Sequence, residues 1–345
     1  MHKPYNMQTG IIGMKEDEIR PKDIFEKFLE LAREDAITFF SNKDEFESVN
    51  CPACENNNST FEFEKSGFSY DLCNNCGTLY VNPRPKSDII KQYYEHSKST
   101  KYWAEHFYKD TEVQRREKIF KPRAKMIRDF VKKEIGGKVD VFADIGAGYG
   151  GFLEEVRDIN IAEKIIAIEP SDDLAMICEN KGFDVIQSSL EESTDTLQHH
   201  VSLATSFELF EHLHSPKEFL DGVRNILADG GYFIFTTLNI NGFDLQVLWE
   251  QSNSISPPHH LNFFNLESAE QLLKKCGFTI LEKTTPGFLD VDIVKNAHKE
   301  GNIKLENRFI RYLIENTDDS TQGMFQQFLR DNNLSSHMCI IAQRD

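Results

Sequence analysis

The sequence predicts an α/β protein, in which a mostly parallel sheet has helices on both faces, with a small cysteine-rich module ahead of it. Strand-like and helix-like stretches alternate from Gly136 onward, as in VDVFADI, FLEEVRDI, KIIAIEP, DDLAMICENK, FDVIQSS and VSLATSF. This alternation is typical of parallel sheets. A glycine-rich turn follows the first of these strands, and four cysteines form two CxxC pairs between Cys51 and Cys76. Together these features predict a large and a small module in one chain.

The length and net charge of the chain limit which fold and which partners it can have. The chain has 345 residues, of which 28% are charged and 39% hydrophobic, and its net charge is −17. This is the composition of a folded protein, and the length allows two domains. Because a nucleic-acid-binding protein needs cations that face phosphate, the acidic balance argues against nucleic acid as the main partner. Residues 115–128, with seven Lys or Arg and one acid, are a local exception.

The apolar runs and the single cysteines indicate the cellular compartment of the protein. The longest apolar runs have strand length, such as Tyr232 to Thr237, so no membrane span is expected. The opening MHKPYNMQTG lacks the apolar stretch of a signal peptide. Cys178, Cys276 and Cys339 are scattered singly, which suits a reducing compartment. We therefore expect a cytoplasmic protein, and the sequence carries no signal of its oligomeric state.

Helical patterns, cysteines and prolines divide the chain into four segments. Apolar residues at helical spacing predict a helix over 21–40, with Pro21 in its first turn. Pro83 and Pro85 end the cysteine-rich segment, and the sequence from 87 to about 133 predicts helices. The predicted division is an N-terminal helical segment over 1–48, a zinc ribbon over 49–86, a helical lid or linker over 87–135, and the α/β domain over 136–345 with a helical insertion at about 288–334.

Turn residues mark the later elements of the α/β domain. Ser215 is expected to cap a helix, and Gly230-Gly231 is expected to end it. Asn265 is expected to cap the next helix, which stops at Gly277. Strands are expected over 279–283 and 337–343.

The two CxxC pairs have the spacing of a zinc site. Zinc prefers four soft or borderline ligands in a tetrahedron, and each CxxC turn places two thiolates on one side of it. Four thiolates leave the ion no open position, so the zinc is expected to be structural. Four free thiols or a redox pair are the alternatives, and the regular spacing favours the metal. The predicted ligands are Cys51, Cys54, Cys73 and Cys76.

The turn after the first strand predicts a cofactor site. Gly146, Gly148 and Gly151 fit GxGxxG, in which glycines let the backbone approach a ligand in front of a helix N-terminus. Glu169 ends the next strand, where an acid accepts ribose hydroxyls. Asp144 favours S-adenosylmethionine over a dinucleotide, because a carboxylate would repel a pyrophosphate. The alternative is a glycine-rich turn without a ligand.

At this point the sequence resembles a known family. The stretches DIGAGYGG, IEPS, FELFEHLHSP and GGYFIFTT resemble the class I S-adenosylmethionine-dependent methyltransferases over about residues 136–286 and the last strand. The fold implied is a Rossmann-like, seven-stranded sheet with an antiparallel strand near one edge. The motifs CxxCGTLYVNPRP, YYEHS, KYW and PPHHLNFF are similar to a subgroup associated with surface-glycan and sugar modification.

The resemblance implies cofactor contacts around the turn and the next three strands. The glycines would contact the methionine part, Glu169 would hold the ribose, and residues after the third strand would flank the adenine. Many relatives have an acid where Ser188-Ser189 stands here, which leaves the adenine contact less defined. The implied set is Asp144, Gly146, Ala147, Gly148, Gly151, Glu169, Pro170, Ser189, Leu190, Phe207 and Glu208.

Methyl transfer requires that the acceptor be aligned and lose a proton, for which histidine is a suitable base near neutral pH. Pro257 to Phe264 follows the fifth strand, at the sheet edge where ligands of α/β proteins bind. His259 or His260 is therefore the first candidate for the base, and His212 is the next. Packing or loop bonding is the alternative for each of them.

The helical segment 87–135 is expected to cover the site. Its aromatic side chains offer stacking faces for a sugar or base, and its cations can grip phosphate or a carboxylate. A core role for the aromatics and a solvated helix face for the cations are the alternatives. The residues singled out are Tyr102, Trp103, Arg116 and Arg123.

The sequence thus predicts a methyltransferase with two cofactors, S-adenosyl-L-methionine and structural Zn²⁺. Through the resemblance alone, the acceptor is a hydroxyl of a sugar, a nucleotide-linked sugar or a glycan precursor. The rivals are carbon methylation of a keto-sugar, methylation of RNA or protein, and an inactive scaffold with the same fold.

Overall fold

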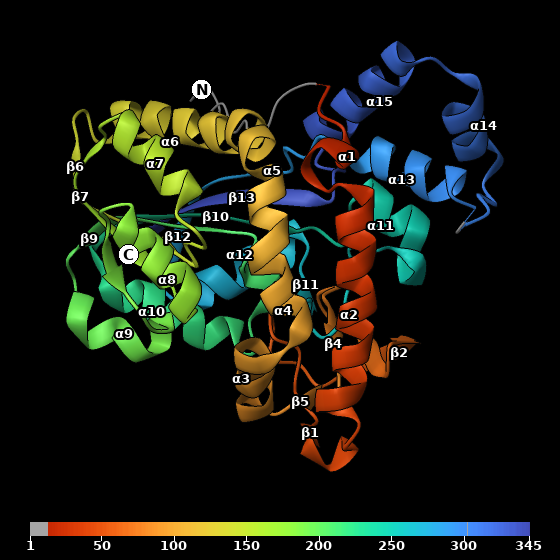
Figure 1. Cartoon of the computed structure of the whole chain (residues 1–345), viewed down its shortest axis with the longest axis horizontal. Coiled ribbons are helices and arrows are strands. Elements are labelled where there is room, and N and C mark those ends of the chain that lie inside the picture. The colour runs from red at the N-terminus through yellow and green to blue at the C-terminus, as the bar shows by residue number, and fades with distance from the viewer. Residues whose placement is uncertain (1–12, 302) are drawn as a thin grey trace.

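The computed structural model describes residues 13–301 and 303–345, so the opening MHKPYNMQTG lies outside the described part. At its centre is a seven-stranded sheet of order β12-β13-β10-β9-β6-β7-β8 (Figure 1). Its strands are β6 (Val139–Ile145), β7 (Ala162–Ile168), β8 (Asp184–Ile186), β9 (Val201–Phe207), β10 (Leu227–Leu238), β12 (Phe278–Thr284) and β13 (His337–Arg344). The first five pair in parallel, and β13 runs antiparallel between β10 and β12. The predicted fold class is confirmed.

Helices cover both faces of this sheet (Figure 1). One face packs against α6 (Lys121–Glu134), α7 (Gly151–Asp158) and α8 (Asp172–Asn180). The other packs against α9 (Leu190–Leu197), α10 (Pro216–Ile226) and α12 (Leu266–Lys275). Each face has its own apolar core, and the strands present alternate side chains to the two cores. The carboxyl ends of the parallel strands form the edge at which the loops discussed below converge.

Two capping predictions are confirmed and one turn prediction is wrong. Ser215 Oγ accepts from the amide of Glu218, and Asn265 Oδ1 accepts from the amide of Ser268. Gly230 and Gly231 do not end α10, which stops at Ile226. They lie inside β10, where a register shift against β9 between Leu227 and Tyr232 accommodates them. Glycines of this kind mark a bulge as readily as a helix end.

The cysteine-rich segment forms a second, four-stranded sheet. Its order is β11-β4-β3-β2, with β2 (Ser59–Lys65), β3 (Phe68–Cys73), β4 (Leu79–Val81) and β11 (Asn262–Phe263). The hairpin formed by β2 and β3 turns at Ser66 and Gly67, which both have positive φ. β11 pairs antiparallel with β4 although it comes from the loop that precedes α12. The small sheet is therefore built from two distant parts of the chain.

The helical segments at the N-terminal side lie against each other. They comprise α1 (Glu16–Ile19), α2 (Lys22–Phe40), α3 (Ser87–His96), α4 (Lys98–Tyr102) and α5 (Tyr108–Arg115), and the pair of short strands β1 (Phe46–Glu47) and β5 (Arg84–Pro85) lies below them in Figure 1. The buried carboxylate of Asp35 on α2 accepts from the amides of Lys98 and Ser99, which satisfies the start of α4. Single π-helical turns at Trp103–Phe107 and Arg116–Phe120 link α4, α5 and α6.

The predicted insertion is helical and projects from the sheet at the upper right of Figure 1. It consists of α13 (Asp290–Lys299), α14 (Arg308–Asn316) and α15 (Asp319–Asp331), next to α11 (Phe243–Leu248). Asp290 anchors it, because its carboxylate accepts from the amide of Ser336 at 2.6 Å and from Gln326 Nε2 at 2.7 Å. None of the helices in the described part of the chain has both the length and the apolar character that crossing a membrane requires.

Candidate functional site

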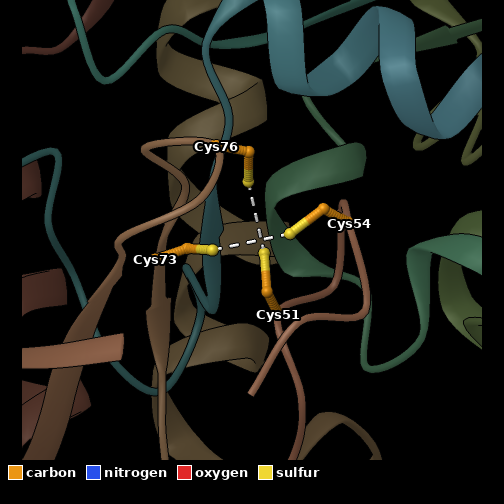
Figure 2. A group of neighbouring side chains, drawn as sticks. All are labelled: Cys51, Cys54, Cys73 and Cys76. Carbon is orange, nitrogen blue, oxygen red and sulfur yellow. Dashed lines mark hydrogen bonds between the residues drawn. The ribbon is translucent and has the colours of Figure 1, made fainter. Parts of the chain in front are cut away.

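The four predicted metal ligands converge in the structure. Figure 2 shows the four sulfur atoms turned toward one another, and all of them lie within 4.8 Å of one another. The Sγ atoms of Cys51 and Cys76 are 3.5 Å apart, as are those of Cys54 and Cys73. All four are free thiols, and the hydrogen bond from Cys51 lowers the pKa of Cys76 to about 5. A cluster of four cysteine sulfur donors of this kind fits a tetrahedral zinc ion.

The cysteine module is fastened to the loop that carries the paired histidines. Tyr70 Oη donates to the carbonyl of His260 at 2.9 Å. The guanidinium of Arg84, only 2% exposed, donates to the His214 carbonyl at 2.6 Å and to Asn262 Oδ1 at 3.0 Å. Charge-assisted bonds to buried acceptors are among the stronger polar contacts. The module therefore fixes the backbone on both sides of the sheet edge, a role that the sequence pattern of Tyr70 and Arg84 did not indicate.

The glycine-rich turn has the backbone that its sequence predicts. Gly146, Gly148 and Gly150 all have positive φ, a region that favours glycine. The turn is closely packed, because a Cβ on Gly146 would lie 3.0 Å from Leu209 Cδ2. Tyr108 of α5 covers the turn, with its hydroxyl 3.6 Å from the position that a Cβ on Gly148 would take. Tyr108 was not among the predicted site residues.

Glu169 closes the other side of this turn. Its Oε2 accepts from the amide of Gly148 at 2.8 Å, and its Oε1 accepts from the amide of Ser171 at 3.0 Å. Burial raises its pKa to about 7. Pro170, which follows it, is exposed. The carboxylate is thus held in one orientation beside the turn, as a ribose contact requires.

Asp144 lies beneath the turn at the end of β6. Its Oδ1 accepts from Thr205 Oγ1 at 2.7 Å, and burial raises its pKa to about 7. Ala147 is also buried. Leu190 belongs to the core under Gly222 and is 3% exposed, while Ser189 precedes α9 without a side-chain capping bond. Because the Leu190 side chain is buried in this core, only the backbone of Leu190 can contact a ligand.

A charged network joins the lid to the end of β9. Glu208 Oε1 accepts from Arg123 Nη2 at 2.5 Å, from His337 Nε2 at 2.8 Å and from Thr236 Oγ1 at 2.6 Å. Burial raises the pKa of Glu208, but the Arg123 guanidinium and the hydrogen bonds from His337 and Thr236 hold it well below its usual range. The guanidinium of Arg123 also lies 4.6 Å from the ring centroid of Phe207. The structure therefore places Arg123 beside two predicted cofactor residues.

The paired histidines have different surroundings. His259 is 6% exposed, and its Nε2 lies 2.6 Å from the hydroxyl of Tyr93 within an aromatic cluster that includes Phe28. His260 Nδ1 lies 2.6 Å from the carbonyl of Ser254 and must donate to it. Burial lowers the pKa of His259 to about 3 and that of His260 to about 4. His259 is thus a member of the core, whereas His260 faces another group of polar side chains.

That group is a cluster of Glu211, His212 and His260. Their ligand-type atoms all lie within 4.8 Å of one another, and the two imidazole rings are 4.6 Å apart. Thr237 Oγ1 donates to Glu211 Oε2 at 2.8 Å, and the hydroxyl of Tyr94 lies 3.4 Å from His212 Nδ1. Glu211 is 2% exposed, and burial raises its pKa to about 7. Glu211 and Tyr94 were not among the predicted site residues, although they lie within the motifs FELFEHLHSP and YYEHS.

The other three predicted substrate residues do not join the charged network around Glu208. Trp103 stacks on Phe107 at 3.6 Å and packs against Phe28 at 4.6 Å, within the helical segment. Tyr102 packs on His106 at 4.6 Å. Arg116 pairs with Glu155 and Asp158 of α7 on the outer side of the domain. The structure therefore brings Arg123 to the sheet edge and places Trp103 beside Tyr108, to which it hydrogen-bonds. Tyr102 and Arg116 make the other contacts named here.

The parallel sheet with an antiparallel β13 and a glycine-rich turn after its first strand defines the class I methyltransferase fold. Residues 114–283 match a family model described as a methyltransferase domain. The chain therefore carries a class I S-adenosylmethionine-dependent methyltransferase domain, and the protein is a methyltransferase that uses this cofactor.

Several solved structures are similar to this chain at low sequence identity. One from Thermotoga maritima, described as a possible histamine N-methyltransferase, is 19% identical, with 59% of this chain and 81% of that chain covered and a TM-score of 0.40. A putative sarcosine dimethylglycine methyltransferase from Galdieria sulphuraria is 16% identical, with 63% and 86% covered and a TM-score of 0.42. A cyclopropane synthase from Mycobacterium tuberculosis is 16% identical, with 65% and 84% covered and a TM-score of 0.42. No curated protein matches the sequence.

Proposed function

We propose that this methyltransferase transfers a methyl group to a hydroxyl of a sugar, a nucleotide-linked sugar or a surface-glycan precursor. The acceptor class is supported by the resemblance of the cysteine module and of the PPHHLNFF motif to a sugar-modifying subgroup. The observation that carries the proposal is the position of the Glu211–His212–His260 cluster, since Leu209, two residues before Glu211, contacts the glycine-rich turn at Gly146. Donor and acceptor sites of this kind must be neighbours for methyl transfer.

The cofactor is assigned to the glycine-rich turn. Glu169 binds the ribose hydroxyls, the backbone at Ser189 and Leu190 flanks the adenine, and Gly146, Ala147, Gly148 and Gly151 surround the methionine part. Asp144, Phe207 and Glu208 complete this end, next to Arg123. S-adenosylmethionine supplies an electrophilic methyl carbon and a sulfonium leaving group. Arg123 and Tyr108 place the helical segment 87–135 over the turn, which supports its role as a lid.

The acceptor is assigned to the cluster of Glu211, His212 and His260. We expect the hydroxyl to be held there and to lose its proton there, because these are the proton-accepting side chains that meet at the edge next to the turn. His259 supports this region by packing, since its ring nitrogen is engaged with Tyr93. Zinc at the four cysteines is structural in this proposal and holds β3, β4 and β11 together.

The test separates cofactor binding from methyl transfer. Calorimetry with S-adenosylmethionine measures the first, and transfer of a labelled methyl group to a panel of nucleotide-linked sugars measures the second. We expect His212→Ala and His260→Ala to bind the cofactor as the unaltered protein does and to lose turnover by about 100-fold or more.

Two controls give this test its meaning. His96→Ala changes an exposed histidine of α3 and is expected to leave both measurements unchanged. His259→Ala is expected to lower thermal stability first, because its ring is enclosed by aromatic side chains. Turnover that survives in the His212 and His260 variants would move the acceptor site away from the cluster, and absence of cofactor binding in the unaltered protein would overturn the proposal as a whole.

A further inference from the structure

We propose that Glu211, His212 and His260 bind a divalent cation, zinc or a similar borderline metal, at a second site that is distinct from the four cysteines. This inference rests on the proposed function, because it gives the acceptor cluster a metal. Two histidines and one carboxylate are a donor set that holds catalytic zinc with a further position open. Among the described residues, this cluster and the four cysteines are the two groups whose donor atoms converge in this way.

The orientation of each donor supports a metal. His260 Nδ1 donates to the Ser254 carbonyl at 2.6 Å, which leaves the lone pair of its Nε2 free to coordinate. Thr237 Oγ1 holds one oxygen of Glu211 at 2.8 Å. The His212 ring hydrogen-bonds the backbone of His259. Metal ligands are characteristically fixed by outer partners of this kind, and here each of the three has one.

The distances between the donor atoms fit a site whose ligands move closer together when a metal ion binds. Donor atoms on a tetrahedral zinc ion lie about 3.4 Å apart, given bonds of about 2.1 Å. The three atoms here lie within 4.8 Å of one another, so they need to approach by no more than about 1.4 Å to bind the ion. The ring planes of His212 and His260 are at 82° to each other, and the ring centroids are 4.6 Å apart. The rings therefore do not stack, and stacking does not block the space for an ion.

The charges also balance. A divalent cation carries two positive charges, Glu211 supplies one negative charge, and a deprotonated acceptor oxygen supplies the other. The filled site is then neutral and does not repel the cationic sulfonium group. Nearby Glu208 is already engaged by Arg123 and His337, so it does not compete for the ion.

The chemistry that follows is that of an activated hydroxyl. With the ion bound, the three side chains act as its ligands and no longer take the proton themselves. An acceptor oxygen in the open position has a lowered pKa, and its proton passes to water. The new bond forms between that oxygen and the methyl carbon as the carbon–sulfur bond breaks, and the electron pair of that bond stays on sulfur. No oxidant or further reactant is needed.

Metal content per chain tests the inference without relying on activity. The full-length protein is dialysed with ZnCl₂, freed of loose metal on a desalting column and measured by mass spectrometry. We expect about two zinc ions per chain, and about one in Glu211→Gln, His212→Ala and His260→Ala. Glu211→Gln keeps the size of the side chain and its contact with Thr237, so it separates loss of a ligand from loss of folding. His96→Ala is the matched control and keeps both ions.

Cobalt gives a second measurement. Co²⁺ in the cysteine site has strong thiolate absorption, and Co²⁺ in a nitrogen and oxygen site has only weak visible bands. Cys73→Ser is expected to weaken the thiolate absorption and to leave the weak bands unchanged. One ion per unaltered chain, or two ions that persist in all three cluster variants, would overturn the inference. Full methyl transfer with a single ion also overturns it and leaves the proposed function standing. Two ions in a protein that binds no S-adenosylmethionine support the metal site and reject the proposed function.

Discussion

The carboxylate of Glu169 accepts a hydrogen bond from the backbone amide of Gly148 at 2.8 Å, which ties the end of β7 to the turn that follows β6. Glu169 is 6% exposed, so this contact is part of the site before any ligand arrives. The acid that we assign to the ribose and the turn that we assign to the methionine part therefore form one preorganised unit, in which a ligand contact requires little further ordering.

Glu169→Ala is expected to weaken S-adenosylmethionine binding by at least about tenfold, because it removes two acceptor oxygens from a buried site. Glu169→Gln retains the shape and one acceptor and is expected to lose less. Calorimetry on both variants measures the dissociation constant. An alanine variant with the affinity of the unaltered protein would place the cofactor elsewhere.

Cofactor binding is expected to strengthen as the pH rises from about 6 to 8. Burial raises the pKa of Asp144 and of Glu169 to about 7, so in the free protein both carboxyls lose their protons only in this range. The cationic cofactor and its ribose hydroxyls favour the ionised carboxylates, so binding releases protons and gains from higher pH. Glu169→Gln should flatten the profile.

In the free protein, the same two groups act on stability with the opposite sense. Their folded pKa values lie above the values of about 4 expected in the unfolded chain. Their contribution to stability is therefore complete below about pH 4 and is lost as the pH rises through about 7. Denaturant unfolding with and without S-adenosylmethionine at pH 6 and pH 8 measures both effects. A pH-independent affinity would show that neither carboxylate contacts the cofactor.

Cys73→Ser is expected to abolish binding of the zinc ion that we propose at the four cysteines and to lower the melting temperature by roughly 10 °C or more. The reason is that the site closes β2, β3 and β4 against the core that contains Phe264. Cys276→Ser is the matched control, since this buried thiol lies outside the cluster. It should keep the metal, as measured by mass spectrometry and by thermal unfolding.

Arg123→Ala is expected to lower the free energy of unfolding by about 2 kcal/mol, because it leaves Glu208 without one of its cationic partners. The effect is smaller than for a fully enclosed pair, since the Glu208 side chain is 32% exposed. Arg128→Ala on the same helix removes an exposed contact with Asp129 and should change stability by about 0.5 kcal/mol or less. Urea unfolding monitors both. Equal changes in the free energy of unfolding for the two variants would show that the Arg123–Glu208 pair contributes no more stability than an exposed pair.

The sheet, the four cysteines and the glycine-rich turn were predictable because each depends on neighbours in the sequence. The cluster at the sheet edge was predictable only in part, because it joins distant segments. His337 comes from the last strand, Tyr94 comes from α3, and neither has a local pattern that points to Glu208 or His212. His259 and His260 are adjacent in the sequence, and only the path of their loop decides which ring enters the core.

The prediction for the basic segment shows a further limit. Arg116 and Arg123 belong to one helical run, and regular spacing would place them by counting residues. The π-helical turn at Arg116–Phe120 adds a residue to that turn and rotates the helix that follows. Arg123 therefore reaches the sheet edge while Arg116 pairs with α7.

The short strand β11 has a consequence for anyone who would recombine this enzyme with others. It lies two residues after His260 and completes the sheet that the cysteines organise. Exchanging the N-terminal ribbon for that of another protein would replace β4, the strand with which β11 pairs. It would thereby shift His259 and His260. Such chimeras should be designed with the ribbon and residues 254–265 transplanted as a matched pair, even though nearly two hundred positions separate them along the chain.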